Sequence, residues 1–217
     1  MEKYLTHESI KQLEQRKRAA LINSLSGFKS LNLVGTTNKQ GQTNLAIFNS
    51  VFHLGAHPPL MGMIVRPDSV ERHTLENILE TNYYTLNHVN EDIYLQAHQT
   101  SARYSRLESE FESTQLTAIY NNDFLAPYVK ESHIRIGLKL VDSKDIELNG
   151  TTLLIGEIQQ LYFPQNCETT DGYLDIEKAG TIAGTGLDGY HLTKKINRLS
   201  YAKTNFNPTP ILSNYFE

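Results

Sequence analysis

Hydrophobic residues near the start of the chain recur at spacings that place them on one face of a helix. These positions are Ile10, Leu13, Ala20, Leu21 and Leu25. Gly27 follows where the end of a helix favours a residue with left-handed backbone angles. The pattern predicts a helix over roughly residues 7–25. We therefore expect an N-terminal helical arm, residues 1–26, ahead of one domain over residues 27–217.

Three strand-like runs follow the arm in close succession. They read SLNLVGTT, TNLAIFNSVF and LMGMIVRP, and they are separated by the turn NKQG and the breaker HPP. Connections this short favour an antiparallel meander over parallel strands with crossover helices.

The second half of the domain alternates between helical and strand patterns. A helix is predicted to begin with Thr74 as its N-cap and to turn Leu75, Ile78 and Leu79 inward. YYTLNHV is expected to be a strand and NEDIYLQAHQTS a short helix, while RYSRLESEF fits either a helix or a loop. The runs SHIRIGLKLVDSKDIEL and TTLLIGEIQQLYF are predicted to be long strands joined by a tight turn at Asn149-Gly150. The fold class is thus mainly β, an antiparallel β-barrel with a few peripheral helices.

The stretch GTGLDGY, residues 184–190, has the G-x-G-x-x-G spacing of a dinucleotide-binding turn. That turn needs a strand before it and a helix after it, because the helix N-terminus holds the pyrophosphate. The flanking sequences offer neither element clearly. The better interpretation is a glycine-rich loop near the end of the domain.

Composition limits the classes of function. Hydrophobic residues make up 39% of the 217-residue chain and charged residues 20%, which is a globular balance. A net charge of −4 gives no general attraction to nucleic acid, and there is no membrane-spanning run or apolar signal segment, so a cytoplasmic protein without a membrane partner is expected. Cys167 is the only cysteine, and no histidine or carboxylate pattern predicts a metal site.

One combination of residues suggests a ligand site. The second strand carries small and polar residues that let a flat ligand approach the backbone: Thr43, Asn44, Ala46, Asn49 and Ser50. The next strand ends in Arg66, and Arg66 with Arg72 could pair with a phosphate at the start of the Thr74 helix. The alternative is that Arg66 is a solvated strand end and Thr74 only a helix cap. The residues by themselves leave both interpretations open.

Several segments in order resemble a known family. GQTNLAIFNSVFHLGAHPPLMGMIVR, RHTLENI, YTLNHV, SEF and NRLSYAK are similar to the flavin reductase-like proteins with an FMN-binding split β-barrel, over roughly residues 25–203. The chain departs from the family pattern at Ile47, where proline is frequent, at Asn49, where serine is common, and near His73.

The resemblance implies a homodimer that binds FMN near the subunit interface. The implied cofactor-binding residues are Asn44, Leu45, Ala46, Ile47, Phe48, Asn49, Ser50, Arg66, Arg72, His73 and Thr74. It also implies NAD(P)H as electron donor and flavin as the group that carries the redox chemistry, so no catalytic side chain is assigned. Electrons would pass to oxygen, to an oxygenase or another acceptor protein, or leave with free reduced FMN. Tyr190, His191 and Tyr201 are candidates for nicotinamide contact or for aromatic packing.

Two other functions remain compatible with the sequence. One is a flavin-binding electron carrier that has no NAD(P)H site of its own. The other is a split barrel that binds a different planar cofactor, such as pyridoxal phosphate or haem.

Overall fold

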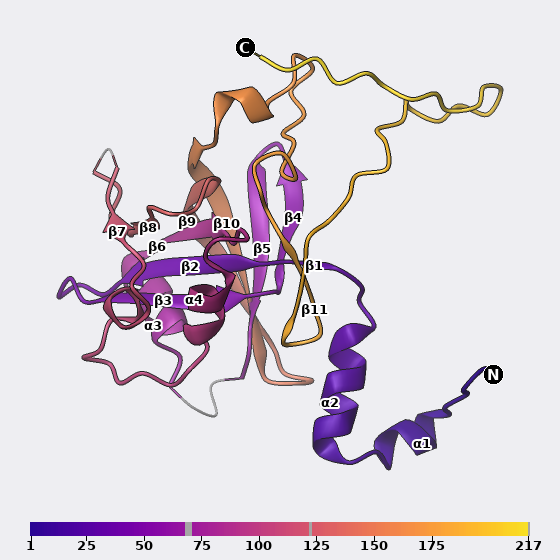
Figure 1. Ribbon diagram of the computed structural model, residues 1–217. Helices are drawn as coiled ribbons and strands as arrows, with labels where there is room; N and C mark the ends of the chain where they lie inside the picture. The colour runs from indigo at the N-terminus through magenta and orange to yellow at the C-terminus, as the bar shows by residue number, and fades with distance from the viewer. Residues whose placement is uncertain (68–70, 122, 217) are drawn as a thin grey trace.

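The computed structural model describes residues 1–67, 71–121 and 123–216, and Figure 1 shows a curled β-sheet with short helices around it. The helices are α1 (His7–Lys11), α2 (Gln15–Ser24), α3 (His73–Thr81), α4 (Tyr94–Gln99) and α5 (Glu110–Thr114), with one 3-10 turn at Gln165–Cys167. The strands are β1 (Lys29–Ser30), β2 (Asn32–Thr37), β3 (Thr43–Phe48), β4 (Val51–Ala56), β5 (Pro59–Val65), β6 (Tyr83–His88), β7 (Ala118–Ile119), β8 (Tyr128–Val129), β9 (Arg135–Ile146), β10 (Thr151–Tyr162), β11 (Ala183–Thr185) and β12 (Gly189–His191).

A seven-stranded antiparallel sheet forms the body, in the order β3-β2-β6-β9-β10-β5-β4. Its two edge strands, β3 and β4, follow one another in the chain with only Asn49 and Ser50 between them. The sheet must therefore curl until its edges approach, although the edges themselves do not pair. The result is an antiparallel barrel that is split between β3 and β4, and the predicted mainly β fold class is confirmed.

The strand β2 is buried on both faces, and its side chains divide the core in two. Val34 points into the barrel interior with Met63, Tyr84 and Leu154. Leu33, its neighbour, points to the opposite face and packs beneath α4 and α5. This alternation follows from the two-residue period of a strand, and it fixes which residues of the paired strand β3 face the barrel.

The predicted meander is wrong at one step. TNLAIFNSVF is two strands, β3 and β4, because the chain leaves one sheet edge at Asn49 and enters the other. Ser50 holds this crossing: its hydroxyl donates to the Ile64 carbonyl (2.7 Å), and its carbonyl accepts from the Ile64 amide (3.2 Å). The pairings β2 with β3 and β4 with β5 are antiparallel hairpins, as predicted.

The predicted N-terminal helix is interrupted. The first segment ends at Lys11 with Gln12 as its C-cap, and Glu14 caps the second. The Glu14 carboxylate accepts from the amides of Arg16 and Lys17, both at 2.9 Å. Neither α1 nor α2 contains a buried residue, so the apolar stripe read from the sequence does not face the core of its own chain. Both helices extend away from the barrel at the lower right of Figure 1. Gly27 has the expected left-handed backbone (φ +75°).

Two further predictions need adjustment. Arg72, not Thr74, is the N-cap of α3, and Leu79 is half exposed, whereas Ile78 is fully buried. The hairpin of β9 and β10 is present, but Thr151 pairs with Ile146, which makes the connection four residues long. The ambiguous segment ends in α5, which begins at Glu110.

The glycine-rich stretch forms a hairpin. β11 and β12 pair antiparallel around residues 186–188, and Gly186 has φ +60° at the turn. No helix follows in the described chain up to residue 216, so the dinucleotide-binding turn is excluded. None of the helices in the described ranges is long and apolar enough to cross a bilayer.

Candidate functional site

A cavity of about 630 Å³ lies at the split of the barrel. Its floor is the end of β3 and the crossing at Asn49 and Ser50, and one side is formed by the end of β5 and the start of α3. The opposite side comes from His98 at the end of α4, from residues 100–104 after it, and from the hairpin of β11 and β12. Its volume lies in the range of small-molecule and cofactor sites.

The structure brings together almost all of the residues predicted for cofactor binding. The cavity is lined by Asn44, Ala46, Ile47, Phe48, Asn49, Ser50, Arg66, Arg72, His73 and Thr74. Leu45 is the exception, because its side chain points to the other face of β3 and is fully buried beneath α4 and α5. Whether these residues bind FMN remains a prediction.

One corner of the cavity is suited to an anion. The first turn of α3 opens toward it at His73 and Thr74, and the N-cap Arg72 makes no side-chain cap bond to the helix. Amide groups at such a helix start point outward and carry a partial positive charge. Arg66 and Arg103 line the same cavity, and neither makes an ion pair within the described residues. The Arg72 guanidinium donates a hydrogen bond to the Pro67 carbonyl (3.0 Å), which orients it.

Beside this corner, three side chains form a buried polar group. The Asn44 amide lies 2.9 Å from the Thr74 hydroxyl, and when its nitrogen faces Glu110 it donates to that carboxylate at 3.3 Å. Glu110 also accepts the backbone amide of Leu45 (2.9 Å). Burial raises the pKa of Glu110, although the Leu45 hydrogen bond and the charges of His73 and Arg106 oppose the rise. This group ties the edge strand β3 to α3 and α5.

The opposite wall is aromatic. The sequence named Tyr190 as a candidate for nicotinamide contact or aromatic packing, but it did not assign His98 or Tyr94. The Tyr190 hydroxyl lies 2.8 Å from His98 Nδ1, and the Tyr190 ring lies 5.5 Å from that of Tyr94. His191 turns away to Thr185 Oγ1 (2.8 Å) and to the edge of the Phe28 ring, while Tyr201 is exposed and does not line the cavity. The G-x-G-x-x-G spacing lies in this hairpin. Its glycines do not form a dinucleotide-binding turn but let the hairpin turn over the cavity.

The cavity has the features that a flat phosphorylated ligand needs. The small residues Ala46 and Ser50 leave space for a planar ring close to the backbone, and the start of α3 with Arg66 suits a phosphate. The fold and the site define a split barrel with a cofactor-sized pocket and an anion corner. FMN fits this set of groups, because its phosphate is the anion that the start of α3 and Arg66 suit.

Residues 25–180 match the family described as "Flavin reductase like domain". The chain therefore belongs to the flavin reductase-like domain family, whose split barrel implies a flavin cofactor.

Solved structures agree with this assignment. A protein described as a candidate flavin reductase with a split barrel domain, from Shewanella frigidimarina NCIMB 400, is 54% identical, with a TM-score of 0.90 over 93% of this chain and 100% of that one. The nitrilotriacetate monooxygenase component B from Bacillus cereus is 21% identical with a TM-score of 0.80 over 92% of this chain and 100% of that one, which shows a shared fold. An uncharacterized protein of Aquifex aeolicus (strain VF5) is 27% identical over 114 residues, which make up 52% of this chain and 58% of that protein.

Proposed function

We propose that this protein is an FMN-dependent oxidoreductase that takes a hydride from NAD(P)H and delivers electrons to a further acceptor. The observation that carries the proposal is the anion corner at the split, where the open start of α3 and the Arg66 side chain face a cavity large enough for a flavin. Among the described residues Arg66 makes no ion pair. Membership of the flavin reductase-like family supports the same chemistry.

In this proposal each wall of the cavity has a separate task. Arg66, Arg72 and the first amides of α3 hold the phosphate, and the Asn44 to Ser50 segment of β3 and the crossing supports the ring and its side chain. When bound, FMN supplies the hydride-accepting and electron-transferring chemistry. The protein therefore needs no acid or base for hydride transfer, and its contribution is to orient both ligands and exclude water.

In this proposal the nicotinamide binds beside the hairpin of β11 and β12. Tyr190 and His98 present aromatic rings to the cavity from the wall opposite β5 and α3, and a nicotinamide could stack there. We further propose that the protein works as a homodimer and that its acceptor is oxygen, an oxygenase, another acceptor protein, or free flavin.

The phosphate assignment is tested by comparing FMN with riboflavin. Arg66→Ala should weaken FMN binding by about 10- to 100-fold, the worth of a charge-assisted hydrogen bond, and should leave riboflavin binding unchanged. Binding is followed by quenching of flavin fluorescence during titration. Arg16→Ala, on the exposed arm helix α2, is the matched control. Equal losses for both ligands would contradict the phosphate role.

The reductase activity is tested by the absorption spectrum of the FMN-loaded protein. Under anaerobic conditions the flavin band should bleach rapidly on adding NADH or NADPH. A band that persists with both donors, at full FMN occupancy, would indicate the electron carrier without its own NAD(P)H site. Failure to bind FMN at all would refute the proposal.

A further inference from the structure

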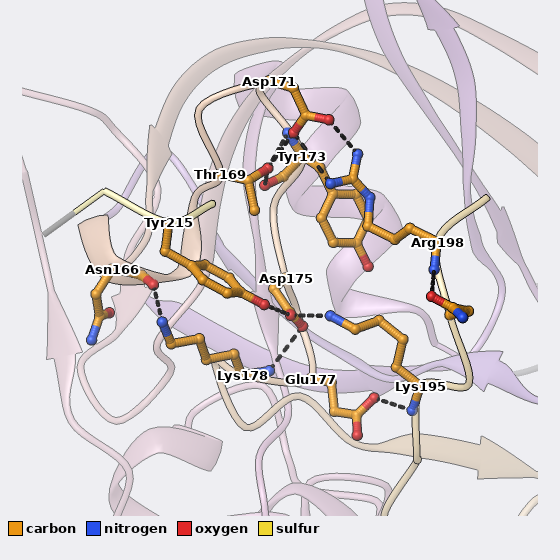
Figure 2. A network of polar contacts seen from close by, with 11 residues as sticks. Asn166, Thr169, Asp171, Tyr173, Asp175, Glu177, Lys178, Lys195, Arg198 and Tyr215 are labelled. Atoms are coloured by element: carbon orange, nitrogen blue, oxygen red, sulfur yellow. Dashed lines mark hydrogen bonds and ion pairs between the residues drawn. The ribbon is translucent and has the colours of Figure 1, made fainter. Parts of the chain in front are cut away.

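The chain beyond β12 forms a tail, residues 192–216, that is fastened to the body at its base. Figure 2 shows the fastening. The Arg198 guanidinium forms two hydrogen bonds with the Asp171 carboxylate (2.6 and 3.2 Å) and stacks over the Tyr173 ring, 4.1 Å from its centroid. Lys195 pairs with the buried Asp175. The start of the tail is thus held in a defined position.

The end of the tail returns to the same place. The Tyr215 hydroxyl donates to Asp175 (2.6 Å), and the Lys178 ammonium lies 3.7 Å from the centroid of the Tyr215 ring (Figure 2). The Thr170 amide also donates to the Asn214 carbonyl (2.8 Å). Both ends of the tail are therefore anchored to residues 166–178. The segment between the two anchors is a loop whose ends are held in place.

Between the anchors, residues 196–212 form what we call the C-terminal finger. Leu199 pairs with Pro210 and Lys203 with Phe206, and the Ser200 amide donates to the Thr209 carbonyl (2.9 Å). Figure 1 shows the finger in yellow, reaching away from the barrel before the chain returns to its C-terminus. The finger is hydrogen-bonded internally, so it is a hairpin-like projection.

The finger exposes large apolar side chains that a solvated hairpin does not need. Tyr201 is 89% exposed, Phe206 73%, and Ile196 98%. The whole chain exposes 13704 Å². A compact monomer of 24.6 kDa exposes only about 10,000 Å² by size scaling. The excess is about 3,600 Å² per chain, or about 7,200 Å² for two chains. This is more than the roughly 2,000–5,000 Å² that the two partners of many obligate homodimers bury in total.

The charge of the finger and its base indicates which surface receives it. Residues 192–216 contain four basic residues and no acidic one, and the whole chain has a net charge of −4, so the rest of the chain carries −8. Lys195 and Arg198 are paired within the base, whereas Lys194 and Lys203 are exposed and form no ion pair within the described residues. The acidic body of a second copy is therefore the complementary surface.

We propose that the C-terminal finger of each subunit lies on the body of a second copy of this chain, and that this exchange of fingers holds a homodimer. It deepens the homodimer of the proposed function and does not depend on flavin binding. The fixed base limits the entropy lost when the finger is ordered on the partner.

The test compares two sets of surface substitutions by analytical ultracentrifugation over a range of concentrations. The finger variant is Tyr201→Ser with Phe206→Ser. The control is Leu148→Ser, an equally exposed apolar residue in the turn between β9 and β10. The wild type and the control should be dimers with the same dissociation constant. The finger variant should dissociate at least about 100-fold more readily, because each substitution occurs twice in the dimer.

A measurement on the unchanged protein complements the variants. Amide hydrogen exchange in residues 199–210 should slow when the wild type is taken from concentrations at which it is monomeric to those at which it is dimeric. A wild type that stays monomeric, a finger variant that dimerises like the control, or finger exchange that is insensitive to concentration would overturn the proposal. So would a monomer whose finger is protected only by anionic lipid vesicles. Failure of the reductase proposal would appear separately, as absent FMN binding in an intact dimer.

Discussion

Glu110 is a buried acidic residue in the wall of a cavity that has a corner suited to an anion. The sequence offered only the segment SEF, whereas the structure shows that the carboxylate binds the Leu45 amide and faces Asn44 and Thr74. Its role is to hold the free edge of β3, since amides on a sheet edge otherwise lack a partner. This makes Glu110 a positioning residue for the cavity floor.

The ionisation of Glu110 should make stability depend on pH. Burial raises the pKa of the Glu110 carboxyl above the ordinary 4.5, so the folded protein favours the protonated form. The stabilisation from this protonated carboxyl is complete below pH 4.5 and is lost as the pH rises through the folded-state pKa. Glu110→Gln cannot ionise, and its amide oxygen can still accept from Leu45. The variant should therefore gain stability relative to wild type as the pH rises above 4.5.

Thermal unfolding midpoints of both proteins between pH 4 and pH 8 measure this difference. Glu112→Gln, on the exposed side of the same helix, is the control and should follow the wild type at every pH. A constant difference between Glu110→Gln and wild type across the range would show that Glu110 does not titrate as expected.

At the scale of elements, the hairpin of β11 and β12 completes the cavity. The hairpin comes from a part of the chain far from β3 and α3. Its Gly186 carbonyl nevertheless accepts hydrogen bonds from the side-chain amide of Asn49 (3.0 Å) and from the Lys29 ammonium (3.5 Å). These contacts hold the hairpin at the split. Tyr190 is therefore fixed over the cavity from both sides, by Asn49 through the hairpin and by His98 directly.

The Tyr190 ring gives a prediction for the nicotinamide side. Under the proposed function, Tyr190→Ser should raise the KM for NADH or NADPH about 3- to 10-fold, as expected for one aromatic contact, while FMN affinity changes little. Tyr190→Phe keeps the ring and should stay near the wild-type KM. Steady-state kinetics at saturating FMN separate the two variants. A loss in Tyr190→Phe as large as in Tyr190→Ser would assign the effect to the His98 hydrogen bond.

At the scale of the whole molecule, the tail depends on charged groups at its base. Burial alone would raise the pKa of Asp175, but hydrogen bonds from Lys195 and Tyr215 outweigh it and hold the pKa at about 2. A lowered pKa stabilises the folded state above the ordinary value of 3.8, and this stabilisation is lost as the pH falls toward 2. Acid should thus release the tail through Asp175, and also through Asp171, whose pKa the Arg198 hydrogen bonds lower strongly.

Hydrogen exchange measures this release directly. Between pH 4 and pH 2, protection in residues 195–216 should fall before protection in β9 and β10, after correction for intrinsic exchange rates. Asp175→Asn should weaken tail protection already at pH 7, because the ion pair with Lys195 is absent. Simultaneous loss of protection in the tail and the barrel would mean that the tail has no separate unfolding step.

The sequence predicted most of the local structure but less of its assembly. Antiparallel pairing, the long strands around Asn149-Gly150 and the buried Ile78 follow from local patterns. The break at Asn49 could not be read, because one apolar run continues through a point where the chain changes from one sheet edge to the other. The helix break at Glu14 depends on a side-chain cap that spacing alone does not reveal.

For the site, the chain order placed the floor and the anion corner together, because β3, β5 and α3 are close in sequence. Glu110 and His98 could not be assigned in the same way, and Tyr190 was named only as a candidate with its role left open, since all three reach the cavity from segments that are distant in sequence. The amino-acid sequence by itself determined the antiparallel strands, the arginines that we predict to bind a phosphate, and the likeness to a flavin-binding family. Only the tertiary structure decided where the barrel splits, which face of β3 meets the cavity and where the tail projects, because these depend on long-range packing.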